Sequence, residues 1–516
     1  MTNGDFLIWS AALTGLLFVF ALGCIVGSFI NVVAYRLPLG MGLVMPPSSC
    51  PACGTRLTWR ENFPVLGWLW LGGKCRFCRS AISAQYPMIE FIVGLLFAGL
   101  FALWYMQPSV LTWAGLDVSV FRDEFVRLGV WRTWPFFVSV LFLIGSLVAI
   151  TLIDARTFMI PLAIPVWATF VGIAAHLGNA IYFQLTRSAH QLGEMKWAIP
   201  TPSGWALGGT IGATAGLMIS LALLYGKILK RSFADYEEWE KAHATKEAAG
   251  GASGAGETNI STDHKGSEAS GGAGETGAPV RMVLMRTLFL TGPAIALMFL
   301  GFTIGLPLDR PMQGMIAGAA GGLLVGMFLR RLVPDAGHHA SDPVWIQYPY
   351  ARREMVREIT FLLPVVALGV AGALLTRESG WLGQLAANPP LWVKAVGGSL
   401  LGYLIGAGMI WFTRIAATLV FGREAMGLGD VHLMGAVGAV LGWVTPVLAF
   451  FTAPFLGLAW AAMSVVFGRF LKRVGTALPY GPHLAMGTLL ALYGRPVYEI
   501  IFSLIASPTG ETIHLP

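Results

Sequence analysis

The sequence contains few charged residues and few cysteines. Only 12% of its 516 residues are Asp, Glu, Lys or Arg, whereas soluble domains carry about 25%. A soluble chain of this length needs a more charged surface, and a disordered chain is less apolar than the 55% hydrophobic content found here. Five cysteines are too few for a disulfide-rich secreted scaffold. The composition therefore predicts a polytopic membrane protein.

Long apolar runs recur along the whole chain. A helix needs about 20 apolar residues to cross a hydrocarbon core roughly 30 Å thick. Such runs lie at 6–26, 88–106, 136–153, 162–183, 204–226, 287–306, 312–329, 358–376, 391–413, 433–449, 452–468 and 483–504. We therefore expect an all-α fold with about 12 transmembrane helices, embedded in the lipid bilayer.

The distribution of basic residues predicts the orientation of these spans. The chain has 34 Lys and Arg against 27 Asp and Glu, a net charge of +7. If the N-terminus lies outside, 25 of the 34 basic residues fall in inward-facing segments. Cytoplasmic loops of membrane proteins show this bias. The basic excess therefore has a membrane explanation, and we expect no nucleic-acid partner.

Two polar segments interrupt the apolar pattern. One holds four cysteines, and the other is rich in Gly, Ala, Ser and Glu and cannot bury enough apolar surface to fold. The predicted organisation is a first transmembrane helix at 1–29, a small cytosolic cysteine module at 30–87, a membrane part at 88–230, a disordered cytosolic linker at 231–286, inserted membrane helices at 287–390 and a second membrane part at 391–516.

The four cysteines of the module form two C-x-x-C pairs, Cys50 with Cys53 and Cys75 with Cys78. Each pair can direct two thiolates at one ion, and two pairs complete a closed tetrahedron. The pattern predicts a structural, zinc-ribbon-like site that stabilises a loop too small to hold its own core. Unmetallated thiols or a redox pair are the alternative interpretation.

Two aspartates lie at the ends of predicted spans. Asp154 ends the apolar run LFLIGSLVAITLID, and Asp430 follows Gly427 and Gly429 in the sequence GLGD. Carboxylates at membrane depth are costly, and the predicted topology places both on the cytoplasmic face. Two carboxylates that share one water can divide peptide hydrolysis, because the ionised one accepts a proton from water while the protonated one polarises the scissile carbonyl. Such a pair needs no catalytic metal. Either aspartate alone is also compatible with a loop residue that simply meets water.

Around these residues the chain resembles the prepilin peptidases, the type IV leader peptidases of the GxGD class of aspartic membrane proteases. The matching blocks are GSFINVVAYRLP at 27–38, the cysteine block at 50–90, LIDARTFMIP at 152–161, GREAMGLGDVHLMGAVGAVLG at 422–442 and PYGPHLAMG at 479–487. The resemblance implies that Asp154 and Asp430 are the catalytic aspartates.

The resemblance also implies a function and a location. Members of this family cut the leader from type IV prepilins or pseudopilins, at the cytosolic face of the bacterial inner membrane. They serve type IV pilus or type II secretion systems, whose assembly machinery is a further expected partner. Many also methylate the new N-terminus with S-adenosylmethionine, an activity linked to the N-terminal cytosolic domain.

The chain departs from the family pattern in three places. His432 stands where a Lys often follows the second aspartate, and Leu162 replaces an acidic or amide residue. The interval between the aspartates is also longer, by about four spans relative to an expected core of eight. Two other hypotheses use the same aspartates: a transporter or channel with proton or cation sites, and an inactive assembly scaffold.

Overall fold

The computed structural model of the chain describes residues 3–106, 124–186, 197–235, 350–377, 380–422, 424–467 and 480–506, with a few isolated positions between 313 and 321. The linker predicted at 231–286 lies outside the described residues beyond Asp235. The span predicted at 287–306 and almost all of that at 312–329 also lie outside them.

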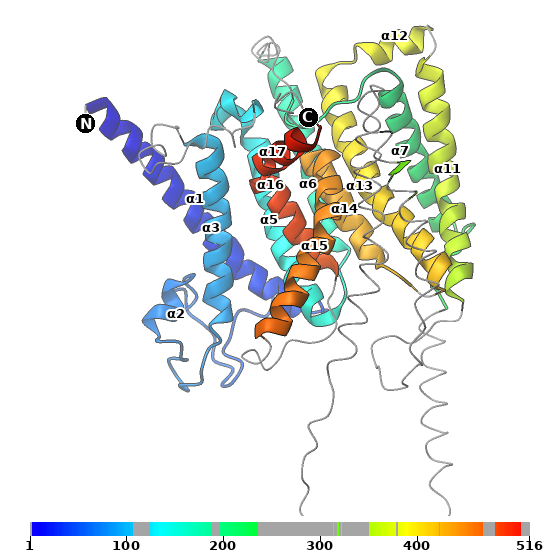
Figure 1. Cartoon of the computed structure of the whole chain (residues 1–516). Coiled ribbons are helices and arrows are strands. Elements are labelled where there is room, and N and C mark those ends of the chain that lie inside the picture. The colour runs from blue at the N-terminus through cyan, green and yellow to red at the C-terminus, as the bar shows by residue number, and fades with distance from the viewer. Residues whose placement is uncertain are drawn as a thin grey trace, which may run out of the picture. The chain divides into compact units, whose positions relative to one another are not determined.

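Helices form the regular structure of the described residues (Figure 1). Their bounds are α1 Asn3–Arg36, α2 Leu66–Trp70, α3 Gln85–Tyr105, η2 Phe125–Leu128, α5 Val130–Thr157, α6 Ala163–Leu185, α7 Gly204–Tyr225, α11 Ala351–Arg377, α12 Trp381–Ala387, α13 Leu391–Phe421, α14 Leu428–Leu441, α15 Val444–Phe467, α16 Tyr480–Tyr493 and α17 Arg495–Ala506. The same residues contain only two isolated β-bridges, Ser49 with Arg56 and Lys74 with Ala81.

Eight of the described helices are long and apolar enough to cross a membrane, which confirms the all-α membrane fold. They are α1, α3, α5, α6, α7, α11, α13 and α15. The helix boundaries near the C-terminus differ from the predicted spans. Gly442, with φ 78°, separates α14 from α15, and Gly494 separates α16 from α17. Hydropathy does not detect these breaks, because glycine interrupts a helix without adding polarity.

The core is centred on α5, the most buried of the described spans. In its apolar 18-residue stretch, 72% of the residues are buried, against at most 44% in the corresponding stretch of any other described span. Close packing of small residues joins α1 to α3 beside it. A Cβ atom at Gly23 would lie 2.7 Å from the Cα atom of Gly94, and one at Gly27 would lie 2.7 Å from the Cα atom of Glu90. Glycine therefore lets these two backbones approach each other.

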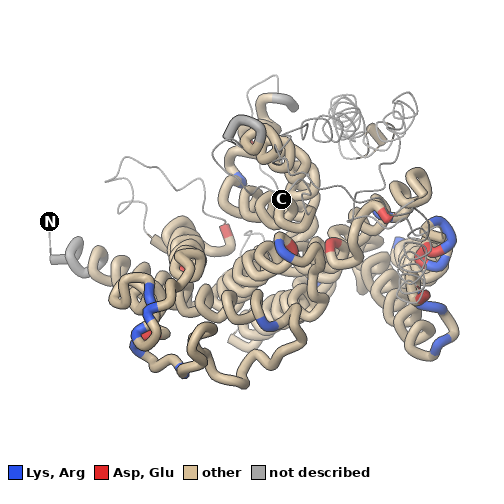
Figure 2. Tube along the Cα trace, turned by 90° about the horizontal axis from the view of Figure 1, so that it is seen from below, with Lys and Arg blue, Asp and Glu red and all other residues tan. Residues whose placement is uncertain are grey.

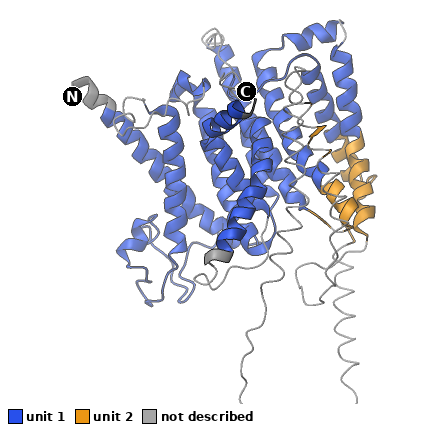
Figure 3. Cartoon of the chain, in the orientation of Figure 1, with its two compact units in different colours: residues 1–217, 364–413, 426–516 blue, residues 218–363, 414–425 orange. Residues whose placement is uncertain are grey.

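The chain forms two compact units (Figure 3). Unit 1 contains residues 1–217, 364–413 and 426–516, and unit 2 contains residues 218–363 and 414–425. Charged residues are sparse along the helices and gather at a few places (Figure 2). Unit 1 contains both aspartates and the cysteine module, so the candidate sites can be built within one unit.

Candidate active site and cysteine centre

Asp154 lies in the last turn of α5, where its side chain is buried. Its carbonyl accepts a hydrogen bond from the backbone N–H of Phe158 at 2.9 Å. Phe158 has a left-handed conformation, φ 53°, which ends the helix. The chain turns back within five residues, and α6 begins at Ala163. This turn fixes the Asp154 carboxyl at the end of the most buried span.

Asp430 is the third residue of α14, and its side chain is also buried. Gly427 is the N-cap and has an extended backbone, so the helix begins abruptly before the aspartate. The first N–H groups of a helix have no partner within it, and this end carries a partial positive charge that favours a nearby carboxylate. The GLGD sequence therefore places Asp430 in a helix N-terminus.

Ile160 and the N-terminus of α16 connect the segments that carry the two aspartates. A Cβ atom at Gly481 would lie 2.6 Å from Asp154 Oδ2 and 3.1 Å from Ile160 Cδ1. The backbone N–H of Gly481 also donates a hydrogen bond to the Asp154 carboxylate. On the other side, a Cβ atom at Gly429 would lie 2.5 Å from Ile160 Cβ. Ile160 therefore touches the residue before Asp430 and the residue that binds Asp154.

Tyr480 completes this arrangement, because its phenol interacts electrostatically with Asp430 while its neighbour Gly481 binds Asp154. The end of α5 and the start of α14 thus lie at the same end of the bundle. Sequence reasoning noted the segment at 479–487 as a matching block but assigned no role to Tyr480, Gly481 or Ile160. Their tight packing is a tertiary contact with no local signal in the sequence.

His432 contacts a different helix. Its Nδ1 atom lies 3.1 Å from Tyr403 Oη of α13, within hydrogen-bond distance. Residues two apart on a helix point in different directions, so His432 and Asp430 leave α14 on different faces. Tyr403 was also missed by sequence reasoning.

The four cysteines of the two C-x-x-C pairs come together. The Sγ atoms of Cys50, Cys53, Cys75 and Cys78 all lie within 4.8 Å of one another, and those of Cys50 and Cys78 are 3.8 Å apart. Tetrahedral zinc with Zn–S bonds of about 2.3 Å would hold its sulfurs about 3.8 Å apart. The cluster could therefore hold a metal ion.

Backbone turns shape both pairs and favour the thiolate of Cys50. Each pair lies in a tight turn: Gly54 N–H donates to the carbonyl of Cys50 at 2.8 Å, and Arg79 N–H to that of Cys75 at 3.1 Å. Backbone N–H groups of Cys53 and Ala52 point at the Cys50 sulfur and lower its pKa to about 6. A lowered thiol pKa favours the thiolate, which is the form that binds metal.

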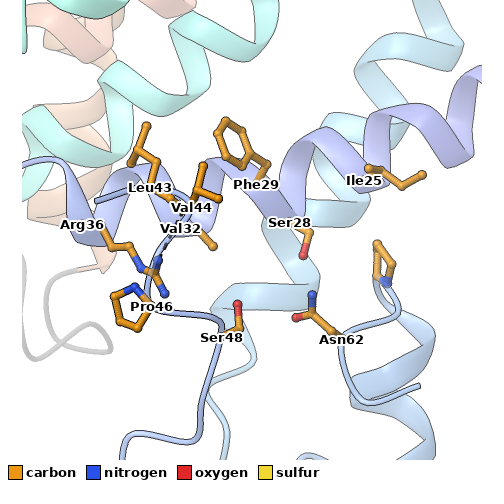
Figure 4. Close-up of a pocket in the computed structure, with 11 residues that line it drawn as sticks. Ile25, Ser28, Phe29, Val32, Arg36, Leu43, Val44, Pro46, Ser48 and Asn62 are labelled. Carbon is orange, nitrogen blue, oxygen red and sulfur yellow. Dashed lines mark hydrogen bonds between the residues drawn. The ribbon is translucent and has the colours of Figure 1, made fainter. Parts of the chain in front are cut away.

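A groove of about 320 Å³ lies between α1 and the module (Figure 4). Its walls come from α1 and from the segments at 43–48 and 62–64. Arg36 fixes one end, because its Nη1 atom donates to the carbonyls of Gly42 at 3.1 Å and Leu43 at 3.3 Å. Phe29, Ser28 and Asn62 supply an aromatic ring, a hydroxyl and an amide. These groups could hold a small polar molecule with an aromatic part.

Two sequence families match parts of the chain. The family described as the bacterial peptidase A24 N-terminal domain matches residues 21–104, which include the cysteine module. The type IV leader peptidase family matches residues 358–462, which include Asp430. Asp154 lies outside both ranges, so its assignment depends on the contacts described above.

Three curated relatives match the chain over stretches of different length. A prepilin leader peptidase/N-methyltransferase of Myxococcus xanthus is 52% identical over 80 residues, which cover 16% of this chain and 24% of the relative. Proteins of the same name are 36% identical over 169 residues in Dickeya chrysanthemi (28% and 50%) and 31% identical over 216 residues in Burkholderia pseudomallei strain K96243 (34% and 61%).

The chain thus spans between about a quarter and three-fifths of the length of these relatives. No solved structure matches it. The family matches cover three of the five blocks that indicated the resemblance, at 27–38, 50–90 and 422–442, whereas the blocks at 152–161 and 479–487 lie outside them. They confirm that resemblance: residues 21–104 are similar to the bacterial peptidase A24 N-terminal domain, and residues 358–462 are similar to the type IV leader peptidase family.

Proposed function

We propose that this chain is a membrane aspartic endopeptidase that removes the leader from type IV prepilins or pseudopilins. The observation that supports this most directly is that the N-terminus of α16 contacts both aspartates: Gly481 contacts Asp154, and Tyr480 interacts with Asp430. A transporter would need charges along a path through the membrane, whereas these carboxylates gather at one end of the bundle. Similarity to the type IV leader peptidases gives the same reaction class.

In the proposed mechanism the two carboxyls share one water. Charge repulsion keeps one protonated while the other is ionised. The ionised carboxylate takes a proton from the water, whose oxygen attacks the scissile carbonyl. The protonated carboxyl hydrogen-bonds to that carbonyl oxygen and transfers its proton as charge develops there. The tetrahedral intermediate then collapses: the carboxyl that took the water proton gives it to the amine nitrogen as the C–N bond breaks, and the other carboxylate takes a hydroxyl proton back. The Gly481 N–H group holds Asp154 in place, and the α14 N-terminus favours charge on Asp430.

The test of this mechanism is cleavage by single variants. Asp154→Asn and Asp430→Asn keep the shape of each side chain and remove its charge. We expect both variants to insert in membranes and to leave a prepilin substrate uncut, because neither can complete the proton transfers alone. Immunoblotting for a shortened product reports the result. Full cleavage by either variant would contradict the mechanism, and a wild-type chain that fails to cut would support a scaffold.

We propose a second activity, N-methylation of the new N-terminus, because the relatives that match are named peptidase/N-methyltransferase. S-adenosylmethionine supplies an electrophilic methyl group for such a transfer. The aromatic ring of Phe29 suits its adenine, and the polar groups of Ser28 and Asn62 suit its hydrogen-bonding edges. We assign these residues to holding it.

Mass spectrometry of the processed prepilin separates the two activities, since one spectrum reports both the cut site and an added methyl group. An Asn62→Ala variant should cut normally and add fewer methyl groups. Equal methylation by this variant and by wild type would remove the groove from the assignment.

We also propose zinc as the metal of the cysteine cluster, on the fit of the sulfur positions to a four-sulfur tetrahedron. Such a site has no open coordination position, so its role is to stabilise the module. We place the chain in the bacterial inner membrane, with the aspartate end of the bundle at the cytosolic face and pilus or secretion assembly proteins as further partners.

A further inference from the structure

A buried ion-pair cluster in unit 2 contains Arg414 of α13 and Glu358 of α11. Their side chains are only 2% and 3% exposed. Arg414 Nε lies 3.2 Å from both carboxylate oxygens of Glu358, and Nη2 lies 3.0 Å from Oε1. An arginine fork held on a carboxylate by several hydrogen bonds has a defined orientation. Glu358 therefore fixes the direction of the Arg414 guanidinium.

The third nitrogen of this guanidinium points at the segment that leads to the active site. Arg414 Nη1 donates to Glu424 Oε1 at 2.6 Å. The Glu424 side chain is 44% exposed. The bond therefore joins the buried Arg414 guanidinium to a carboxylate at the surface. Phe233 covers the same guanidinium, with its ring centroid 5.4 Å from Arg414 Cζ.

Glu424 lies six residues before Asp430, in a segment that contains three glycines, Gly422, Gly427 and Gly429. Gly422 has φ 69°, a left-handed conformation. Glycine-rich segments lose much conformational entropy when they are ordered. Side chains of α13 hold this one: Arg414 binds Glu424, and Thr418 Oγ1 accepts a hydrogen bond from the N–H of Ala425 at 3.2 Å.

We propose that Arg414 is a positioning residue for the peptidase reaction. Oriented by Glu358, it holds Glu424 and thereby restrains the segment from which Asp430 enters α14. This inference rests on the proposed peptidase function. It also gives a role to α11, whose Glu358 supplies the buried partner of Arg414. This helix lies within the region that the sequence predicts as inserted, but the family match begins at Glu358.

The decisive variant is Glu424→Gln, because Glu424 is at the surface and its loss does not leave a gap in the core. We expect kcat to fall about tenfold, since a misplaced catalytic group costs rate, while KM for a prepilin changes less than about twofold. Hydrogen exchange of the peptide covering 421–428 should become faster. The matched control is Asp235→Asn, another exposed carboxylate of unit 2, which pairs with Arg353 at 3.6 Å; it should leave kcat and this peptide unchanged.

Three further variants test whether the effect passes through the Arg414 guanidinium. Glu358→Gln should lower kcat in the same way, and the double variant Glu358→Gln with Glu424→Gln should lose less than the product of the two single effects, because both act through Arg414. Arg414→Lys keeps the charge but cannot bind both carboxylates, so it should resemble the single variants. If Arg414→Lys folds poorly, the two glutamate variants still decide the matter.

The inference is overturned if Glu424→Gln keeps wild-type kcat and exchange. It is also overturned if KM rises and the rise disappears with a substrate whose leader lysines are replaced by glutamine, because Glu424 would then bind the leader. A failure of the proposed function looks different: wild type itself would not cleave. Faster exchange of residues 421–428 in Glu424→Gln would still be measurable in that case and would test the restraint by itself.

Discussion

At the scale of single residues, the environment of the aspartates leaves no room for additional side-chain atoms. Gly481 faces the Asp154 carboxylate so closely that a Cβ atom would lie 2.6 Å from Oδ2. Real Cβ atoms do not approach an oxygen this closely, so either the carboxyl or α16 would have to move. The glycine serves the site by its small size and by the hydrogen bond that its N–H donates.

We therefore expect Gly481→Ala to lower cleavage strongly, by roughly 100-fold, because a displacement of about 1 Å at a reacting group has that effect. The matched control is Gly178→Ala in α6, where a Cβ atom would meet nothing within 4 Å. Initial cleavage rates of a prepilin in membranes check both variants. Similar rates for Gly481→Ala and Gly178→Ala would show that the Asp154 carboxyl tolerates displacement.

At the scale of secondary-structure elements, α14 is held against α13 by a pair of glycines. A Cβ atom at Gly402 would fall on the carbonyl oxygen of Gly438, and one at Gly438 would fall on that of Gly402. Ser399 Oγ also donates to the carbonyl of Ala439 at 2.6 Å. The position of α14, and hence of Asp430, depends on this close crossing.

Gly402→Ala should therefore destabilise the protein by about 1–3 kcal/mol, the usual effect of overpacking. Gly408→Ala on the same helix is the control, because a Cβ atom there would meet nothing within 4 Å, and alanine favours a helix over glycine. Thermal unfolding in detergent should give a lower Tm for Gly402→Ala only. An unchanged Tm would mean that α13 and α14 can separate without loss of stability.

The cysteine module has short segments and an exposed surface, so packing alone does not stabilise it. We expect about one zinc per chain by metal analysis, and loss of the metal in Cys50→Ser. Hydrogen exchange of residues 50–80 should then become faster, while α5 and α14 keep their protection. Cys24→Ser is the control, because Cys24 of α1 is buried against Gly94 of α3, outside the cluster. Retained metal in Cys50→Ser would argue against a four-sulfur site.

At the scale of the whole molecule, the orientation in the membrane follows from charge. The aspartate end of the bundle should face the cytosol. Trp131 in the first turn of α5 and Met159, two residues beyond its last turn, are both exposed. The helix between them is about 42 Å long at 1.5 Å per residue. Trp131→Cys should react with a membrane-impermeant maleimide in intact cells, and Met159→Cys only after permeabilisation. Peptide-resolved mass spectrometry distinguishes these sites from the native cysteines, and the reverse pattern would contradict the orientation.

Much of this organisation could be predicted from the sequence. Membrane spans follow from composition, because lipid admits only long apolar helices whose backbone groups are all bonded internally. The cysteine cluster follows from two local C-x-x-C motifs, and the Cys Sγ atoms do come together. The aspartates stood out because few other acidic residues lie at the ends of apolar runs.

The breaks at Gly442 and Gly494 could not be predicted in this way, because hydropathy measures polarity and a glycine break leaves it unchanged. The contacts of Ile160, Tyr480 and Gly481 with the aspartate regions were also absent from the sequence reasoning. The contacts of Ile160 with Gly429 and of Gly481 with Asp154 join residues more than 250 positions apart, and Tyr480 is 50 positions from Asp430. No local pattern encodes such pairs.

The sequence by itself determined that this protein lies in a membrane, which residue types its proposed chemistry uses and that its four module cysteines cluster, since each depends on composition or on spacing within one segment. Only the tertiary structure decided what surrounds each aspartate, which glycines must remain small, and how Arg414 links Glu358 to Glu424. These depend on the packing of helices distant in sequence, where a difference of one methyl group or of about 1 Å decides whether two groups fit.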